Sequence, residues 1–393
     1  MIYKFPDDFL IGTSTSAFQI ETPVDHHLKG IIAKDGSKLI STIEHEKNRF
    51  RDAKFISKLG NAYRFSLDWG RLQKYPYADF EVKVVNEYKE FLKYLKQKNV
   101  KLLLVLHHFS NPNWFEHMGS WRKKSSVKIY LDYVKKVCEH FGDYVEFYDT
   151  FNEPGVYAMH SYLTGFFPPY IKNNFFYMNQ VVKNMSNASN QAYKILKKNN
   201  KNCKVGFAKS VMNPLPVNFV GIISSKFYNH FFVNMILNRF KNLDYIGLNY
   251  YGEMPVGLIP FSRPDNKKKF DSMNLEHDDM WVTDPIHIKN IIKKIYKKYN
   301  KPIIITENGY CGKKDNLRIK FIKNHLKSIN EIMQNNVKVL GYFYWSTFDN
   351  FELYLGTSFR FGLVNIDYKT MKRKIKSSGV FYSNFSKNKY FED

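Results

Sequence analysis

VEFYDTFNE at residues 145–153 and PIIITENG at residues 302–309 share one pattern, a short run rich in apolar, β-branched and aromatic side chains that stops at a glutamate. The two glutamates are Glu153 and Glu307. The simplest interpretation is that each carboxylate begins a solvated loop, as most glutamates do. Six further runs of the same kind test that interpretation.

The β-rich runs alternate with longer segments of 3.6-residue periodicity, which is typical of parallel strands joined by crossover helices. Eight strand-and-helix units predict a single (β/α)8 barrel over residues 1–393, with a doubly wound sheet as the weaker alternative, because no GxGxxG or P-loop follows the first run. The expected strands are residues 8–14, 62–69, 100–108, 145–153, 203–209, 243–251, 302–309 and 338–346. Expected helices include residues 45–60, 84–99, 126–142, 317–336 and about 370–384.

The composition indicates a compact chain with a large core, because 44% of its 393 residues are hydrophobic and 17% are aromatic. Its three cysteines are far apart and form no C-x-x-C pair, so the sequence supports neither a disulfide framework nor a thiolate metal site. The first residues do not resemble a secretory leader, and no apolar run reaches 18 residues. We therefore expect a cytoplasmic protein.

The formal net charge is +24, and strongly basic proteins often bind nucleic acid or anionic membranes. The basic segments are scattered, however, at residues 266–270, 293–301 and 372–376, and no nucleic-acid-binding motif accompanies them. A solvated lysine-rich surface is the favoured interpretation. We expect no nucleic-acid partner, and membrane contact through the basic surface is an alternative that we do not favour.

Barrel enzymes place their active sites at the carboxyl ends of the strands, so the polar residues at which each run stops are the candidates. Two glutamates that meet over an anomeric carbon can divide glycoside cleavage between an acid and a nucleophile or base. A cation such as Arg64 would keep one of them ionised. The residues expected to converge on one mouth are Gln19, Glu21, Arg64, His107, His108, Asn152, Glu153, Asn249, Tyr250, Tyr251, Glu307, Asn308, Trp345, Asp349, Asn350 and Glu352.

Several longer segments resemble the family-1 glycoside hydrolases, the β-glucosidase and β-galactosidase family. They extend from FLIGTSTSAFQIE (9–21) to RFGLVNIDYKTMKRKIKSSGVFY (360–382), in matching order and spacing over nearly the whole chain. Between them stand NAYRFSLDWGRL (61–72), LHHFSNPNWF (106–115), TFNEPGVYAMHSYLTGFFPP (150–169), DYIGLNYY (244–251), PIIITENGY (302–310) and GYFYWSTFDNFE (341–352).

The resemblance implies a retaining mechanism in which Glu153 is the acid/base and Glu307 the nucleophile. The two carboxyl groups would then lie roughly 5 to 5.5 Å apart. Asn152 would bind the sugar 2-hydroxyl, and Arg64 and Tyr251 would position Glu307.

The resemblance also implies a sugar site made from Gln19, His108, Asn249 and Glu352, with Trp345 stacking on the sugar ring. The substrate would be a small glycoside or an oligosaccharide, and no cofactor is implied. Adjacent histidines such as His107 and His108 can indicate a metal site, but neighbouring strand residues point to opposite faces, so we expect no metal.

Two departures from the family pattern concern indoles. Phe109 stands where many members have tryptophan after the histidine, and Leu353 stands where they usually have tryptophan after the sugar-binding glutamate. Both missing indoles are, by resemblance, donors near the sugar 3-hydroxyl. Thr22 replaces a frequent glycine, which is a milder change. We expect Leu353 to weaken sugar binding or to make it less selective.

Three functions follow from this pattern. The leading one is an exo-β-glycosidase that resembles β-glucosidases. A transglycosylase that passes the sugar to an acceptor such as a glycolipid would keep both glutamates. A non-catalytic carbohydrate-binding relative is disfavoured, because Glu153, Glu307, Asn152 and Arg64 are all present.

Overall fold

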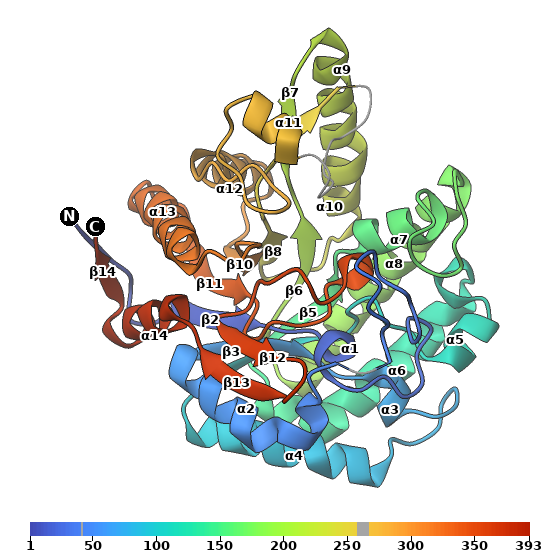
Figure 1. Cartoon of the computed structure of the whole chain (residues 1–393). Coiled ribbons are helices and arrows are strands. Elements are labelled where there is room, and N and C mark those ends of the chain that lie inside the picture. Colours follow the sequence, from blue (N-terminus) through green and yellow to red (C-terminus); the bar gives the residue numbers. More distant parts are fainter. Residues whose placement is uncertain (41, 258–266) are drawn as a thin grey trace.

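The computed structural model describes residues 1–40, 42–257 and 267–393, and its centre is a closed barrel of eight parallel strands (Figure 1). The strands follow the order β10-β11-β2-β3-β4-β5-β6-β8, and β10 pairs with both β11 and β8. All eight predicted strands are present, and closure of the sheet excludes the doubly wound alternative. The barrel strands are β2 (Leu10–Ser14), β3 (Ala62–Ser66), β4 (Lys101–Val105), β5 (Phe147–Asn152), β6 (Lys204–Ser210), β8 (Ile246–Asn249), β10 (Ile303–Asn308) and β11 (Val339–Trp345).

Long helices surround the barrel (Figure 1). They are α2 (His45–Leu59), α4 (Val82–Gln97), α6 (Ser125–Phe141), α8 (Phe175–Asn199), α12 (Ile286–Tyr299), α13 (Asp315–Gln334) and α14 (Ser377–Asn388). Shorter helical segments are α1 (Ala17–Ile20), α3 (Trp69–Leu72), α5 (Asn113–His117), η1 (Ser120–Arg122), η2 (Gly142–Tyr144), α7 (Pro154–Tyr162), α9 (Phe219–Phe227), the π-helix η3 (Tyr228–Asn234), α10 (Met235–Arg239), α11 (Lys267–Ser272) and η5 (Leu353–Leu355).

One predicted helix is partly wrong. Residues 372–375, expected inside a helix over about 370–384, form strand β13 (Lys372–Ile375), which pairs antiparallel with β12 (Val364–Asp367). Helix α14 begins only at Ser377. The reason is that Arg373 turns inward to Asp52, with 3.0 Å between its Nε and the carboxylate Oδ1, while Lys372 and Lys374 are exposed. This alternation has the period of a strand.

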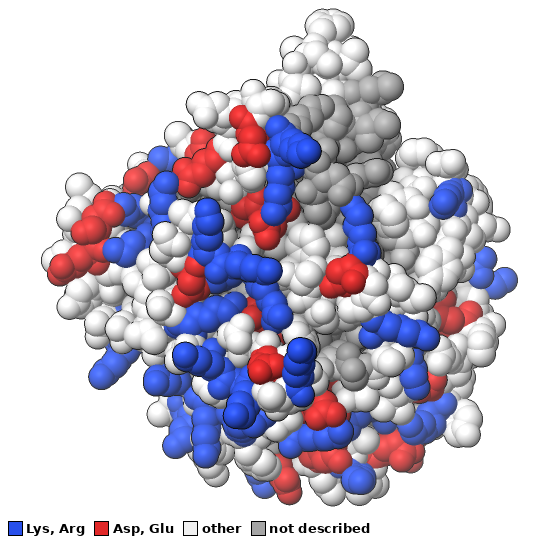
Figure 2. Space-filling model, in the orientation of Figure 1, with Lys and Arg blue, Asp and Glu red and all other residues white. Residues whose placement is uncertain are grey.

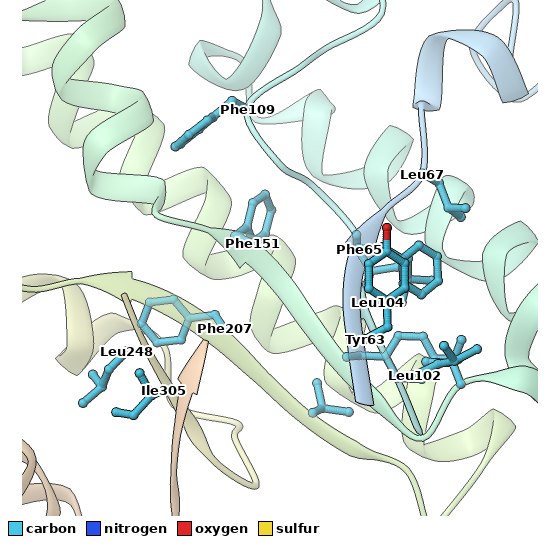
Figure 3. Packing of buried hydrophobic residues seen from close by; sticks show 14 of the residues in the cluster. Tyr63, Phe65, Leu67, Leu102, Leu104, Phe109, Phe151, Phe207, Leu248 and Ile305 are labelled. Atoms are coloured by element: carbon cyan, nitrogen blue, oxygen red, sulfur yellow. The ribbon is translucent and has the colours of Figure 1, made fainter. Parts of the chain in front are cut away.

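The barrel strands bury both faces, and alternation assigns each residue to one of them. On β3, Tyr63 and Phe65 face the helices (Figure 3), whereas Ala62 and Arg64 face the barrel interior. A small apolar cluster fills the interior, so the polar residues are left for the carboxyl ends of the strands. Its members are Leu10, Ala62, Leu103, Val105, Tyr245, Ile304 and Phe343.

Three small sheets lie outside the barrel. Strand β1 (Ile2–Lys4) pairs with β14 (Tyr390–Glu392), and β12 pairs with β13. Strand β7 (Asn213–Pro216) pairs in parallel with β9 (Glu253–Val256). Because β7 follows β6 and β9 follows β8, this third sheet extends from the carboxyl ends of two barrel strands. Within the described residues, no helix is both long and apolar enough to cross a membrane.

Candidate active site

Register shifts turn the key side chains into the barrel mouth. On β10, Ile303 and Ile305 face the helices, so strict alternation would also direct Glu307 outward. The pairing of β10 with both neighbours shifts after Ile305, and Glu307 points inward to Arg64. On β5 a similar shift lies between Asp149 and Asn152. β-Bulges of this kind are frequent beside active sites, where they re-aim a side chain.

Arg64 is the centre of the site and is completely buried. Its guanidinium donates from Nη1 to Glu307 Oε1 at 2.7 Å, from Nη2 to Asn152 Oδ1 at 2.7 Å, and from Nε to Asp149 Oδ2 at 2.8 Å. Nη1 also donates to Ser14 Oγ at 3.0 Å. These four hydrogen bonds engage four of the five guanidinium N–H donors and fix the acceptors around its plane.

Glu307 has a second firm contact, because the Tyr251 hydroxyl donates to its Oε2 at 2.7 Å. Burial raises the pKa of Glu307, while the charge of Arg64 and the hydrogen bond from Tyr251 act against that rise. Both carboxylate oxygens of Glu307 are therefore held by donors that favour its ionised form.

Glu153 has a different environment, because no described cation lies within ion-pair distance of it. Its Oε1 accepts a 2.8 Å hydrogen bond from Asn249 Nδ2, and its main-chain N–H donates to Ala208 O at 2.8 Å. Burial, followed by the charge of Glu307, raises the pKa of Glu153 to about 7. At neutral pH a large fraction of Glu153 is therefore protonated, which suits a general acid.

Asn152 and Asn249 join the two carboxylates into one network. Asn152 Oδ1 accepts from Arg64 and, at 3.0 Å, from Asn249 Nδ2, while Asn152 Nδ2 lies 3.0 Å from His108 Nε2. The Asn249 side-chain oxygen accepts from Thr306 Oγ1 at 2.6 Å. These amides cannot rotate without breaking several hydrogen bonds, so the geometry around the carboxylates is fixed.

The other four expected sugar-binding residues lie close together at the mouth; they are Gln19, His108, Trp345 and Glu352. Trp345 Nε1 donates to Glu352 Oε1 at 2.8 Å, and the Trp345 ring centre lies 5.9 Å from that of His108. Gln19 Nε2 donates to Phe351 O at 2.8 Å and to Asn350 Oδ1 at 3.1 Å. Burial, opposed by hydrogen bonds from Trp345, Asn350 and Gln19, raises the pKa of Glu352 to about 8.

Comparison with known proteins identifies the family. The sequence matches the profile of Glycosyl hydrolase family 1 over residues 1–238 and 234–391. The chain belongs to glycosyl hydrolase family 1. It is 30% identical to β-glucosidase A of Thermotoga maritima, in an alignment that covers 100% of each chain, and 27% identical to a 6-phospho-β-galactosidase of Leptotrichia buccalis, covering 99% of this chain and 100% of the relative.

A solved structure gives the same assignment. The β-glycosidase from Pyrococcus horikoshii superimposes with a TM-score of 0.90 at 30% identity, covering 100% of this chain and 97% of that one. Family 1 membership makes the chain a glycoside hydrolase, and the (β/α)8 architecture is that of its relatives.

This family 1 chain lines one side of its mouth with apolar groups where the two expected indoles are missing. Phe109 packs 6.4 Å from Phe18 and 5.6 Å from Phe167, ring centre to ring centre. Leu353 lines a narrow hollow with Phe18, Phe167 and Phe351. Phe109 and Leu353 therefore both lie beside Phe18 and Phe167.

Several residues expected at the mouth have structural contacts instead. Glu21 accepts hydrogen bonds from Arg71 and Tyr88 in a buried network between α1, α3 and α4. Asp349 pairs with Lys376 at 2.9 Å. The remaining three residues also bond or pack away from the carboxylate pair: Asn308 donates to Tyr250 O, Tyr250 packs on His325, and His107 Nε2 bonds to Asn111 Oδ1. His107 and His108 follow the end of β4 at Val105 and point to different surroundings.

The sequence-based interpretation missed three residues that support this family 1 site. Asp149 accepts hydrogen bonds from Arg64 Nε and from the Tyr245 hydroxyl. The sequence feature that could have identified it is a single acid within the aromatic strand β5. Lys209 is buried on β6, and its sequence signal was a lysine directly after the apolar residues 205–208. Asp278 accepts from the main-chain N–H groups of Met280, Trp281 and Cys311, and no local pattern identifies it.

The role of Asp278 is to fix the loop that supports Tyr251. Trp281, whose main-chain N–H donates to Asp278 at 2.7 Å, stacks on Tyr251 with ring centres 6.2 Å apart and planes at 20°. The loop therefore holds in place the tyrosine that contacts Glu307.

Proposed function

We propose that the protein is a retaining exo-β-glycosidase, similar to β-glucosidases, that acts on small glycosides or oligosaccharides through a covalent glycosyl-enzyme. Glu307 is the nucleophile and Glu153 the acid/base. The whole chain, residues 1–393, acts as one catalytic domain. The observation that carries the proposal is the difference between the two carboxylates. Arg64 and Tyr251 donate to the Glu307 carboxylate, whereas the Glu153 carboxylate accepts from the Asn249 amide alone among the described side chains.

In the first step Glu307 attacks the anomeric carbon, and the protonated Glu153 donates its proton to the departing oxygen. Formation of the ester removes the negative charge of Glu307. Because that charge raises the pKa of Glu153, its loss lowers the pKa and leaves Glu153 ionised. In the second step Glu153 accepts a proton from water, which attacks the same carbon and releases the sugar with retained configuration.

The sugar contacts follow from the unused hydrogen-bonding capacity of the site. Asn152 Nδ2 donates to His108 Nε2, and burial lowers the pKa of His108, so the neutral ring carries its proton on Nδ1. That buried Nδ1 has no partner among the described residues, and Nε2 lies 4.0 Å from Glu307 Oε1, so we expect His108 to contact a sugar hydroxyl bound beside Glu307. Glu352 and Gln19 offer oxygens for a hydroxyl pair, and the Trp345 indole offers a face for the C–H side of the ring.

Azide rescue tests these roles with p-nitrophenyl β-glucoside, β-galactoside, β-fucoside, β-mannoside, β-xyloside and β-galactoside 6-phosphate as substrates. The panel finds the preferred sugar, and the phosphorylated substrate tests the likeness to 6-phospho-β-galactosidase. Glu307→Gly with azide is expected to yield the α-glycosyl azide, and Glu153→Ala with azide the β-glycosyl azide. An exchange of these two products would reverse the roles, and the absence of both would reject the mechanism.

The same assay tests the transglycosylase alternative. Product analysis with an added alkyl alcohol measures the partition between free sugar and alkyl glycoside. We expect free sugar to predominate at low acceptor concentration. A product that is mainly alkyl glycoside at millimolar acceptor would reclassify the enzyme as a transferase without changing the roles of Glu153 and Glu307.

A further inference from the structure

An exposed apolar stripe lies on α9 and the following π-helix η3. Phe219 is 76% exposed, Ile223 is 56% exposed and Phe227 is 47% exposed. Together with Phe231 they recur every fourth residue, so they lie along one side of the helix. We call the exposed large hydrophobic residues of this segment the apolar crest, and they are Phe219, Val220, Ile222, Ile223, Phe227 and Phe231.

The helix is inverted, because its small residues are buried and its large apolar residues are exposed. Asn218 caps it by accepting from the Gly221 N–H at 2.8 Å, and Gly221 and Ser225 form the buried face. A Cβ on Gly221 would lie 2.0 Å from Val256 O, so only glycine permits this close packing on β9. A helix in contact with water normally buries its apolar face. The crest is therefore a surface built for a partner.

The crest stands beside the barrel mouth. Strands β7 and β9, on which α9 packs, continue from the carboxyl ends of β6 and β8, where Lys209 and Asn249 lie. Figure 1 shows α9 projecting from the rest of the molecule, and the visible tip in Figure 2 carries neither acidic nor basic side chains.

The chain segments that carry the crest are rich in positive charge, and the acid on the strand beneath α9, Glu253 of β9, is buried and paired with His287. Residues 154–243, which include α7 to α10, contain ten lysines and one arginine but no Asp or Glu. Helix α12 lies alongside η3, because Lys298 Nζ donates to Asn234 Oδ1 at 2.8 Å, and it adds five lysines and no acid. Lys226, within α9 itself, is exposed.

Three kinds of partner could bind the crest or the lysines around it: a second copy of this chain, nucleic acid and an anionic bilayer. A second copy of this chain would bring another +24 charge toward the first, which opposes association. Nucleic acid would match the lysines but offers little to a stripe of isoleucine and phenylalanine. An anionic bilayer matches both features, since an apolar helix face enters the boundary between headgroups and acyl chains while lysines face the anionic headgroups.

We propose that the apolar crest docks the protein on anionic lipid membranes, with Phe219, Ile223 and Phe227 inserted at the headgroup boundary. Docking in this way places the barrel mouth next to the lipid surface. This inference goes beyond the proposed glycosidase function and does not rest on it, because lipid binding is measured without a substrate.

Vesicle co-sedimentation of the full chain tests the proposal, with phosphatidylcholine vesicles that contain either no phosphatidylserine or about one third phosphatidylserine. We expect binding only to the anionic vesicles, weakened by high salt. The triple variant Phe219→Ser/Ile223→Ser/Phe227→Ser is expected to lose at least ~10-fold in partitioning. Phe50→Ser, which removes another half-exposed aromatic from the distant helix α2, is the matched control and is expected to bind as the parent does.

Light scattering on the same samples decides the competing explanations. Equal binding by the parent and the triple variant, or equal binding to both vesicle types, would overturn the proposal. Dimers of the parent that the triple variant lacks, without vesicle binding, would assign the crest to self-association and also overturn it. An unchanged melting temperature of the triple variant shows that its loss of binding is not a loss of folding.

Discussion

Lys209→Met tests whether a buried cation sets the acidity of Glu153. Lys209 is 3% exposed on β6, directly after Ala208, whose carbonyl accepts the Glu153 N–H, and its ammonium donates to Ser210 O. Burial lowers the pKa of Lys209 to about 8, and the charge of Glu153 acts against this. In return, the Lys209 charge lowers the pKa of Glu153. Removing it is therefore expected to raise that pKa above about 7.

The size of the shift follows from Coulomb's law. A unit charge over ~6 Å at an effective dielectric of ~20 to 40 is worth roughly 1.4 to 2.8 kcal/mol. Because Lys209 is itself partly neutral near pH 8, the smaller interaction energy applies. It corresponds to a shift of about one unit in the pKa of Glu153. The basic limb of kcat/KM reports the acid that must be protonated in the free enzyme, so it is expected to move up by that amount.

The assay is the pH profile of kcat/KM on the best aryl glycoside of the panel. Lys183→Met, the same substitution at an exposed position of α8, is the control and is expected to leave both limbs in place. A basic limb that moves by less than ~0.3 unit in Lys209→Met, with folding intact, would refute the electrostatic coupling. Lys209→Gln provides a polar replacement if the methionine variant does not fold.

Three further predictions concern other contacts. Tyr251→Phe removes the donor to Glu307 Oε2, so the pKa of Glu307 rises, the acid limb of kcat/KM moves to higher pH, and kcat/KM falls roughly 10- to 100-fold at pH 6. Leu353→Trp restores an indole donor and is expected to raise kcat/KM on its preferred aryl glycoside by roughly 5- to 100-fold; a flat response across the sugar panel counts against the hypothesis. Asp52→Ala leaves the buried Arg373 without its carboxylate and is expected to lower the free energy of unfolding in urea by about 3 to 5 kcal/mol, with the KM unchanged.

The strand pattern was sufficient to predict the barrel and to place Arg64 inside it. Residues 62–66 alternate between small or polar residues and large aromatics, and the structure directs the first group inward and the second toward the helices. The same reasoning failed at residues 372–375, where the lysine-rich segment was assigned to a helix although Arg373 and Ile375 alternate with exposed lysines. The strand conformation of residues 372–375 depends on Asp52, a buried acid distant in sequence that pairs with Arg373.

Alternation alone predicts the wrong direction for the most important side chain. Counting from Ile303 and Ile305 sends Glu307 toward the helices, and only the register shift after Ile305 brings it to Arg64. That shift depends on both neighbouring strands, so no window of sequence contains it. The family resemblance implies that Glu307 is the nucleophile. The register shift explains how its side chain can reach Arg64 and the barrel mouth.

Strand β9 connects the apolar crest to Tyr251 at the catalytic mouth. A catalytic measurement can therefore show whether a crest variant has changed more than the crest itself. Strand β9 begins two residues after Tyr251 and carries Val256, against which Gly221 packs. A crest variant that disturbed the β7–β9 pair would also displace Tyr251 and move the acid limb of kcat/KM through Glu307. A variant that loses vesicle binding but keeps the acid limb in place has therefore lost the apolar contact alone. If every crest substitution moved that limb, the stripe would act as a support for Tyr251 and the case for docking would fail.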